Sequence, residues 1–120
     1  RMLFLINNER KKAGVPELTQ DDKLTSVATS YAKDMLENGY LSHYNLDGKS
    51  PFDRMKAADI SVFYEGENLA IASDVDIAMD GLMNSSGHKA NVLSSDFKKI
   101  GVSVYDAGIN GKIFVQEFTD

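Results

Sequence analysis

The stretch Val-Ser-Val-Tyr-Asp-Ala-Gly-Ile-Asn-Gly-Lys-Ile-Phe-Val-Gln-Glu-Phe, residues 102–118, decides the fold class of this chain. Apolar and polar side chains alternate over residues 102–105, and residues 113–118 are rich in β-formers, which indicates two strands. Asn110-Gly111 between them is a strong hairpin signal, because both residues accept a positive φ. We therefore predict an antiparallel hairpin at the end of the chain.

The residues before this hairpin carry helical patterns instead. Apolar side chains three or four residues apart predict helices over residues 2–12 and 24–36, with Thr19–Asp22 as the cap of the second. Two shorter helices are predicted to start at Ser50-Pro51 and at Ser73-Asp74. In the first of these, Arg54 is expected to point away from the apolar face and to pair with Asp53. An order of elements in which the helices come first and a hairpin comes last predicts an α+β fold with helices packed on an antiparallel sheet.

Composition excludes several classes of protein. The net charge of −5 argues against a nucleic-acid-binding protein, and no apolar run reaches the roughly 20 residues that span a bilayer. The absence of cysteine excludes disulfides and thiolate sites. At 120 residues the chain is expected to be one domain, residues 1–120. Because Arg1 and Met2 open an apolar-periodic segment, we expect this domain to come from a longer protein.

Only two histidines occur, and both follow a serine where a helical pattern breaks. His88 lies in Asn84-Ser85-Ser86-Gly87-His88-Lys89-Ala90-Asn91-Val92-Leu93, and His43 lies in Leu41-Ser42-His43-Tyr44. A single histidine is usually a capping or core residue, but imidazole also suits metal binding and proton transfer. Glu65 and Glu67 lie between the two histidines in sequence, next to apolar residues that suggest partial burial. A buried carboxylate needs a partner, and an imidazole or a metal ion would serve.

Ser85 has two possible roles. The favoured one is to cap a short helix that begins near His88, with its hydroxyl oxygen accepting a backbone N–H. A serine nucleophile is much less favoured, because the chain has no Gly-x-Ser-x-Gly elbow. The chain also lacks a His-Glu-x-x-His motif, so a zincin-type protease is not supported.

Several short segments occur in the order seen in one known family. They are Asn7–Arg10 with Gly14, Leu41–His43, Ser50–Arg54, Gly66–Ala70, Asn84–Leu93, Ile100–Val102 and Val115–Phe118. In these segments, over essentially its whole length, the chain resembles CAP domains, also called SCP-like domains. These are shared by cysteine-rich secretory proteins, venom allergens and plant pathogenesis-related proteins. The chain is most similar to their short, cysteine-free bacterial branch.

The resemblance implies a three-layer α-β-α sandwich with a small antiparallel sheet, normally extracellular or on the cell surface, and a central cleft. In animal members two histidines and two glutamates line the cleft, which can hold a divalent ion such as zinc. His43 and His88 match those histidines, and Glu67 matches the glutamate of the Gly-Glu-Asn motif. Leu82 replaces the family's tryptophan, so Ser85 stands where the second acid would be. There the Ser85 hydroxyl would bond an imidazole and fix its tautomer.

Three hypotheses about function follow. The leading one is a secreted or cell-surface bacterial binding module, part of an exported protein, whose cleft takes a divalent metal such as zinc or a small ligand. The cleft residues would be His43, Glu65, Glu67, Ser85 and His88, with the two histidines as metal ligands. The second is a hydrolase of peptide or cell-wall substrates, with Glu67, His43 and His88 as catalytic candidates. The third is a surface interaction domain. A small molecule, a lipid or a cell-wall component is expected as partner, and nucleic acid is not.

Overall fold

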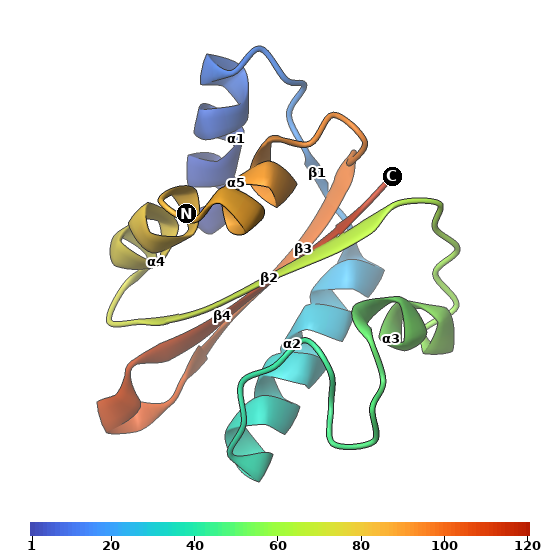
Figure 1. Cartoon of the computed structure of the whole chain (residues 1–120), viewed down its shortest axis with the longest axis vertical. Coiled ribbons are helices and arrows are strands. Elements are labelled where there is room, and N and C mark those ends of the chain that lie inside the picture. Colours follow the sequence, from blue (N-terminus) through green and yellow to red (C-terminus); the bar gives the residue numbers. More distant parts are fainter.

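The computed structural model describes residues 1–120 and has three layers, with a sheet between two groups of helices (Figure 1). Its elements are α1 (Met2–Lys12), β1 (Thr19–Gln20), α2 (Asp22–Asn38), α3 (Pro51–Ala57), β2 (Glu65–Ala72), α4 (Val75–Met83), α5 (Ser86–Leu93), β3 (Lys99–Asp106), the 3₁₀ helix η1 (Gly108–Asn110) and β4 (Lys112–Thr119). None of the helices combines the length and the hydropathy that spanning a membrane requires.

The sheet has the strand order β1-β3-β4-β2, so β2 is an edge strand. β4 lies antiparallel to both β3 and β2, while the short β1 runs parallel to β3. The predicted α-β-α sandwich is therefore confirmed, with a mixed sheet in place of a purely antiparallel one. The residues predicted to cap the second helix explain the difference, because Thr19–Gln20 form β1 and Asp21 alone caps α2.

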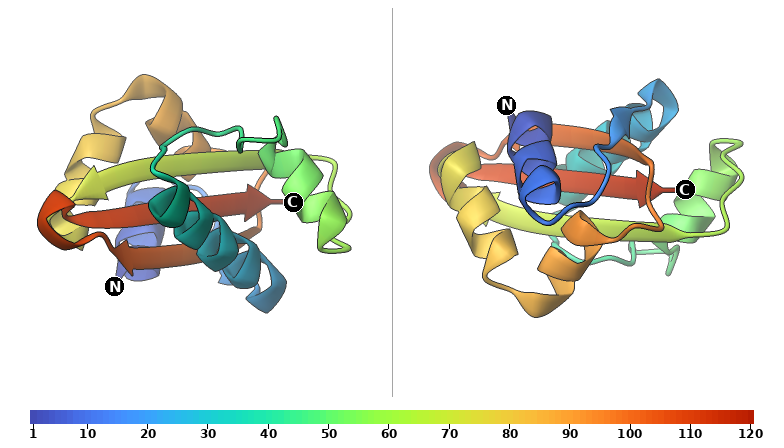
Figure 2. Two further views of the ribbon diagram at one scale, coloured as in Figure 1. Left: turned by 90° about the horizontal axis from the view of Figure 1, so that it is seen from below. Right: turned by 90° about the horizontal axis from the view of Figure 1, so that it is seen from above.

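Alternate residues of β4 face opposite layers, as the period of a strand requires. Phe114 and Phe118 pack beneath α1, α4 and α5, whereas Ile113 and Val115 pack against α2. Figure 2 views the sheet from its two faces, with α2 and α3 over one and α1, α4 and α5 over the other. The central strand is thus buried on both sides.

The helix ends follow the local sequence. Asp21 and Asp74 each accept a backbone N–H at the start of α2 and α4, and Gly39 ends α2 in a left-handed conformation with φ +69°. Ser50 caps α3 as predicted, with Pro51 in the first turn. Asp53 completes this capping box by accepting the Ser50 N–H, so its predicted pairing with Arg54 is wrong.

The predicted hairpin is confirmed between β3 and β4, but its turn is longer than two residues. η1 occupies residues 108–110, and the positive φ values belong to Gly108 and Gly111, with none at Asn110. The pattern of the sequence did not reveal β2, because its residues include Glu65, Glu67 and Asn68 among apolar ones.

Gly101 on β3 sets how closely α2 approaches the sheet. A Cβ atom there would lie 2.1 Å from the carbonyl carbon of Leu24, so only glycine fits beneath the start of α2. In the register of the sheet Gly101 lies opposite Glu117 of β4. The close approach of α2 therefore covers the region around Glu117.

Candidate functional site

The candidate site is built on the edge strand β2. Glu65, Glu67 and Leu69 alternate along the face toward α2, while Asn68 points to the opposite face, toward α5. The side chain of Glu67 is only 1% exposed. Because a buried carboxylate needs partners, the residues that contact Glu67 define the site.

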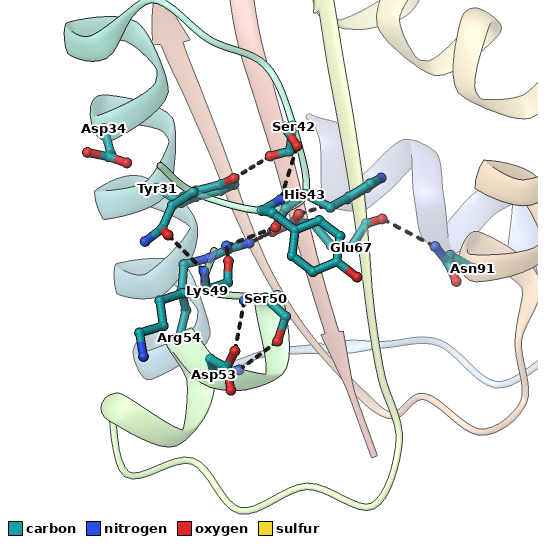
Figure 3. Close-up of polar contacts among 12 residues, drawn as sticks. Tyr31, Asp34, Ser42, His43, Lys49, Ser50, Asp53, Arg54, Glu67 and Asn91 are labelled. Carbon is teal, nitrogen blue, oxygen red and sulfur yellow. Dashed lines mark hydrogen bonds and ion pairs between the residues drawn. The ribbon is translucent and has the colours of Figure 1, made fainter. Parts of the chain in front are cut away.

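His43 is the first partner of Glu67. It lies in the loop between α2 and α3, and its Nδ1 is 2.9 Å from Oε1 of Glu67 (Figure 3). A carboxylate accepts hydrogen bonds and does not donate them, so Nδ1 carries the proton that joins the two residues. The His43 side chain is 48% exposed, which leaves the other edge of the ring open to solvent.

Arg54 on α3 is the second partner of Glu67, donating from Nη2 to Oε2 at 2.5 Å. Its Nη1 donates to the carbonyl oxygens of His43 and Lys49, both at 3.0 Å. The guanidinium lies 3.4 Å from the centre of the Tyr31 ring, a cation–π contact with α2. The expectation that Arg54 points away from the apolar face and does no more than pair locally is wrong, because the buried Glu67 attracts it inward.

Tyr31 also holds the loop that carries His43. Its hydroxyl donates to the carbonyl oxygen of Ser42, the residue before His43 (Figure 3). Burial raises the pKa of Tyr31, with Arg54 acting in the opposite direction. The ring therefore stays neutral and serves as both a donor and a face for the guanidinium.

Glu117 is a residue of this site that sequence reasoning missed. It lies directly opposite Glu67 across β2 and β4, is fully buried, and neither of its carboxyl oxygens has a hydrogen-bond partner by geometry. Burial, followed by contact with Glu67, raises the pKa of Glu117 well above its usual value. The available signal was an acid between apolar residues in a β-rich run, Ile113-Phe114-Val115-Gln116-Glu117-Phe118.

Glu65, the other predicted carboxylate, lies at the exposed start of β2 on the same face as Glu67. Partial burial of its carboxyl, together with the charge of Glu67, raises the pKa of Glu65. No hydrogen bond joins its side chain to another residue, so Glu65 borders the site without holding any of its members.

His88 forms a separate pair with Ser85 at the start of α5. The Nδ1 atom of His88 is 2.8 Å from the Ser85 hydroxyl oxygen. Ser85 occupies the cap position of α5, but its side chain accepts no backbone N–H, so its predicted capping bond is absent. The hydroxyl instead orients the imidazole, as the resemblance to CAP domains implied.

The two pairs lie on elements that flank β2 from opposite faces of the sheet, and amide side chains connect them. Asn91 donates from Nδ2 to Oδ1 of Asn68 at 2.9 Å and to the carbonyl oxygen of Glu67 at 3.4 Å. Asn68 in turn donates to the carbonyl oxygen of His88 at 3.1 Å. The structure thus joins His43 to Glu67 and His88 to Ser85, and links both through Asn68 and Asn91.

The donor atoms available to a metal are the outer nitrogens of the two rings. No group of three or more His, Cys, Asp or Glu side chains is arranged to hold a metal ion. However, both Nδ1 atoms are engaged, by Glu67 and Ser85, and neither Nε2 atom has a hydrogen-bond partner in the chain. Holding one ring nitrogen by a second residue is how proteins orient metal-binding imidazoles, and each of the two rings is held in this way.

A groove of about 630 Å³ lies between α2, α3 and the loop that joins them. Its lining includes Tyr31, Asp34, Leu46 and Arg54, but not His43, Glu67 or His88. This groove is therefore separate from the predicted cleft residues and shares only Arg54 and Tyr31 with the network around Glu67.

The sequence has relatives in bacteria. The model of the family described as "CAP: Cysteine-rich secretory protein family" matches residues 3–118. Two proteins of Bacillus subtilis, the uncharacterized protein YkwD and the uncharacterized membrane protein YlbC, are each 34% identical over 119 residues, or 98% of this chain. The matched region is 45% of YkwD and 33% of YlbC, so this chain spans less than half of either relative.

Solved structures share the fold closely. An extracellular protein of Bacillus anthracis that contains an SCP domain superposes with a TM-score of 0.90 at 34% identity, covering 98% of this chain and 38% of that one. An outer surface protein of Borrelia burgdorferi superposes with a TM-score of 0.92 at 31% identity, covering 99% of this chain and 89% of that one.

Proposed function

Since this chain belongs to the CAP family, we propose that it is a binding module that works outside the bacterial cell or on its surface. Its two imidazoles, His43 and His88, would present Nε2 to a divalent metal ion such as zinc or to a small ligand. The observation that carries this proposal is that Glu67 and Ser85 hold the two Nδ1 atoms. The extracellular and outer surface relatives support the location.

The surrounding residues prepare His43 for binding. Glu67 accepts the Nδ1 proton, so in the neutral ring Nε2 has a free lone pair. Arg54 compensates the buried charge of Glu67 and, through bonds to the carbonyl oxygens of His43 and Lys49, holds the loop that carries His43. A bound zinc ion would supply Lewis acidity and hold a ligand in its open positions.

A hydrolase acting on peptides or cell-wall material is the second candidate. The oriented His43–Glu67 pair favours it, because an imidazole backed by a carboxylate is a common general base. Against it, the side chain of Glu67 is only 1% exposed, so its carboxylate is not placed to take a proton from water directly. We therefore place binding before hydrolysis.

Zinc titration tests the metal part of this proposal. Binding should raise the melting temperature, with a stabilisation of about 2.7 kcal/mol when free zinc is 100 times its dissociation constant. The double variant His43→Ala/His88→Ala removes every imidazole of the chain and should abolish the shift. Asp80→Ala, which removes an exposed carboxylate on α4, should leave the shift unchanged. A shift that persists in the double variant would refute a histidine site.

An activity screen separates the two candidate functions. The wild-type protein and Glu67→Gln should be compared on peptides, peptidoglycan fragments and esters, with and without zinc. Turnover that falls by about 100-fold or more in the variant would support the hydrolase, the scale expected of a lost general base or its orienting group. Equal and negligible rates in both proteins would support the binding module.

A further inference from the structure

Glu117 is the most unusual buried group of this protein. It is 0% exposed, and both carboxyl oxygens lack a hydrogen-bond donor by geometry. An unpaired buried carboxylate would cost several kcal/mol in desolvation, which natural proteins avoid by pairing or protonation. Its burial follows from the close approach of α2 at Gly101, its neighbour on β3.

The one cation near Glu117 is already paired with another acid. The titratable groups that face it are Glu65 and Glu67 on β2, Arg54 on α3, and beyond these His43 and Tyr31. Arg54 is the only permanent cation, and its terminal nitrogens already serve Glu67 and two loop carbonyls. The Nε of Arg54 is buried without a partner, but no hydrogen bond joins it to Glu117.

We propose that Glu117 is held as the neutral carboxylic acid, that its O–H donates to the carboxylate of Glu67, and that Glu117 thereby acts as a positioning residue for His43. One proton then lies between the two carboxyl groups, and the single charge of Glu67 is matched by Arg54. The raised pKa of Glu117, caused first by burial and then by Glu67, agrees with this state.

The consequence for the site is a carboxylate held from three sides. Glu67 would accept from His43, from Arg54 and from Glu117, which come from a loop, a helix and the neighbouring strand. Three donors fix the rotation of the carboxylate and so the direction in which the His43 ring points. Removing such an outer partner typically weakens metal binding by about 10- to 100-fold.

Infrared spectroscopy tests the protonation state directly. Near neutral pH, wild-type protein with ¹³C-labelled glutamate should show the C=O stretch of one protonated carboxyl group, and Glu117→Gln should lose that band. Glu37→Gln, which changes an exposed glutamate on α2, should retain it. A wild-type spectrum without the band would overturn the inference and point to an ionised Glu117. A band that survives in Glu117→Gln would overturn it too, because the proton would then lie on another carboxyl group.

The positioning role needs a second readout, because a buried substitution also affects stability. Nitrogen-15 NMR of His43 should report the Nδ1–H tautomer in wild type and in Glu117→Gln, whose amide N–H₂ still donates to Glu67. Glu117→Met fills a similar space without a donor, and here the tautomer should become mixed and zinc affinity should fall by about tenfold. An unchanged His43 spectrum in folded Glu117→Met would refute the role.

This inference rests on the proposed function only for the zinc measurement. If wild-type protein binds no zinc, the metal site fails, while the infrared band and the His43 spectrum still decide the state and role of Glu117. If Glu117→Met does not fold, the infrared comparison with Glu117→Gln remains decisive. The two proposals can therefore fail separately.

Discussion

Replacing Arg54 by methionine should destabilise this protein far more than removal of an exposed arginine. Arg54 is only 12% exposed and is the partner of Glu67, which is 1% exposed, so Arg54→Met leaves a buried carboxylate without a cation. Breaking a buried ion pair in this way costs about 3 to 5 kcal/mol. Domains of this size have an unfolding free energy of about 5 to 15 kcal/mol, so the loss is a large fraction of the total.

Urea unfolding, monitored by circular dichroism, measures this loss. Two further variants serve as a control and as a rescue. Arg1→Met breaks an ion pair with Asp76 whose side chains are 57% and 58% exposed, and should cost at most about 1 kcal/mol. The double variant Arg54→Met/Glu67→Gln removes the stranded charge and should be about 2 kcal/mol more stable than Arg54→Met alone. The reasoning is refuted if Arg54→Met costs no more than Arg1→Met, or if the second change restores nothing.

Two further predictions concern the packing and the protonation of the same region. Gly101→Ala should lower the unfolding free energy by about 1 to 3 kcal/mol, because its Cβ would meet the backbone of Leu24. Gly81→Ala, which has open space around it on α4, should raise the unfolding free energy by up to about 1 kcal/mol. Urea unfolding of both variants checks these two changes. Because the folded-state pKa of Glu117 is raised, wild type should lose stability relative to Glu117→Gln as pH rises above the usual value of 4.5, by at most about 1.4 kcal/mol per pH unit. A difference that stays constant from about pH 5 to about pH 7 would contradict a neutral Glu117.

Much of the fold could be predicted because the relevant signals are local. The cap at Ser50, the glycine end of α2 at Gly39 and the hairpin before β4 depend on residues within a few positions of one another. β2 escaped prediction because its polar residues Glu67 and Asn68 are buried, so its pattern lacks the apolar-polar alternation of a surface strand. Pattern reasoning assumes that polar residues face water, and this assumption fails for the buried side chains of Glu67 and Asn68.

Some residues of the candidate site could likewise be identified from the sequence, and others could not. The two histidines were identified from their rarity, and together with Glu67 from the short motifs around them that resemble those of the family. Arg54 and Glu117 were not identified as site residues. From the sequence, Arg54 was expected to be a surface residue of a short helix, and Glu117 is one polar residue of a strand. Their importance depends on a contact with Glu67 that spans 13 residues in one case and crosses from β4 to β2 in the other.

The amino-acid sequence by itself therefore determined the class of fold, the presence and order of the helices, the family and the scarce imidazoles, because propensities and motifs act over short distances. Only the tertiary structure decided which acids are buried, which one is paired with Arg54, and that the imidazoles form two pairs connected by amides across an edge strand. Burial and pairing depend on the summed packing of α2, α3 and the sheet around each carboxyl group, and no local pattern encodes that environment.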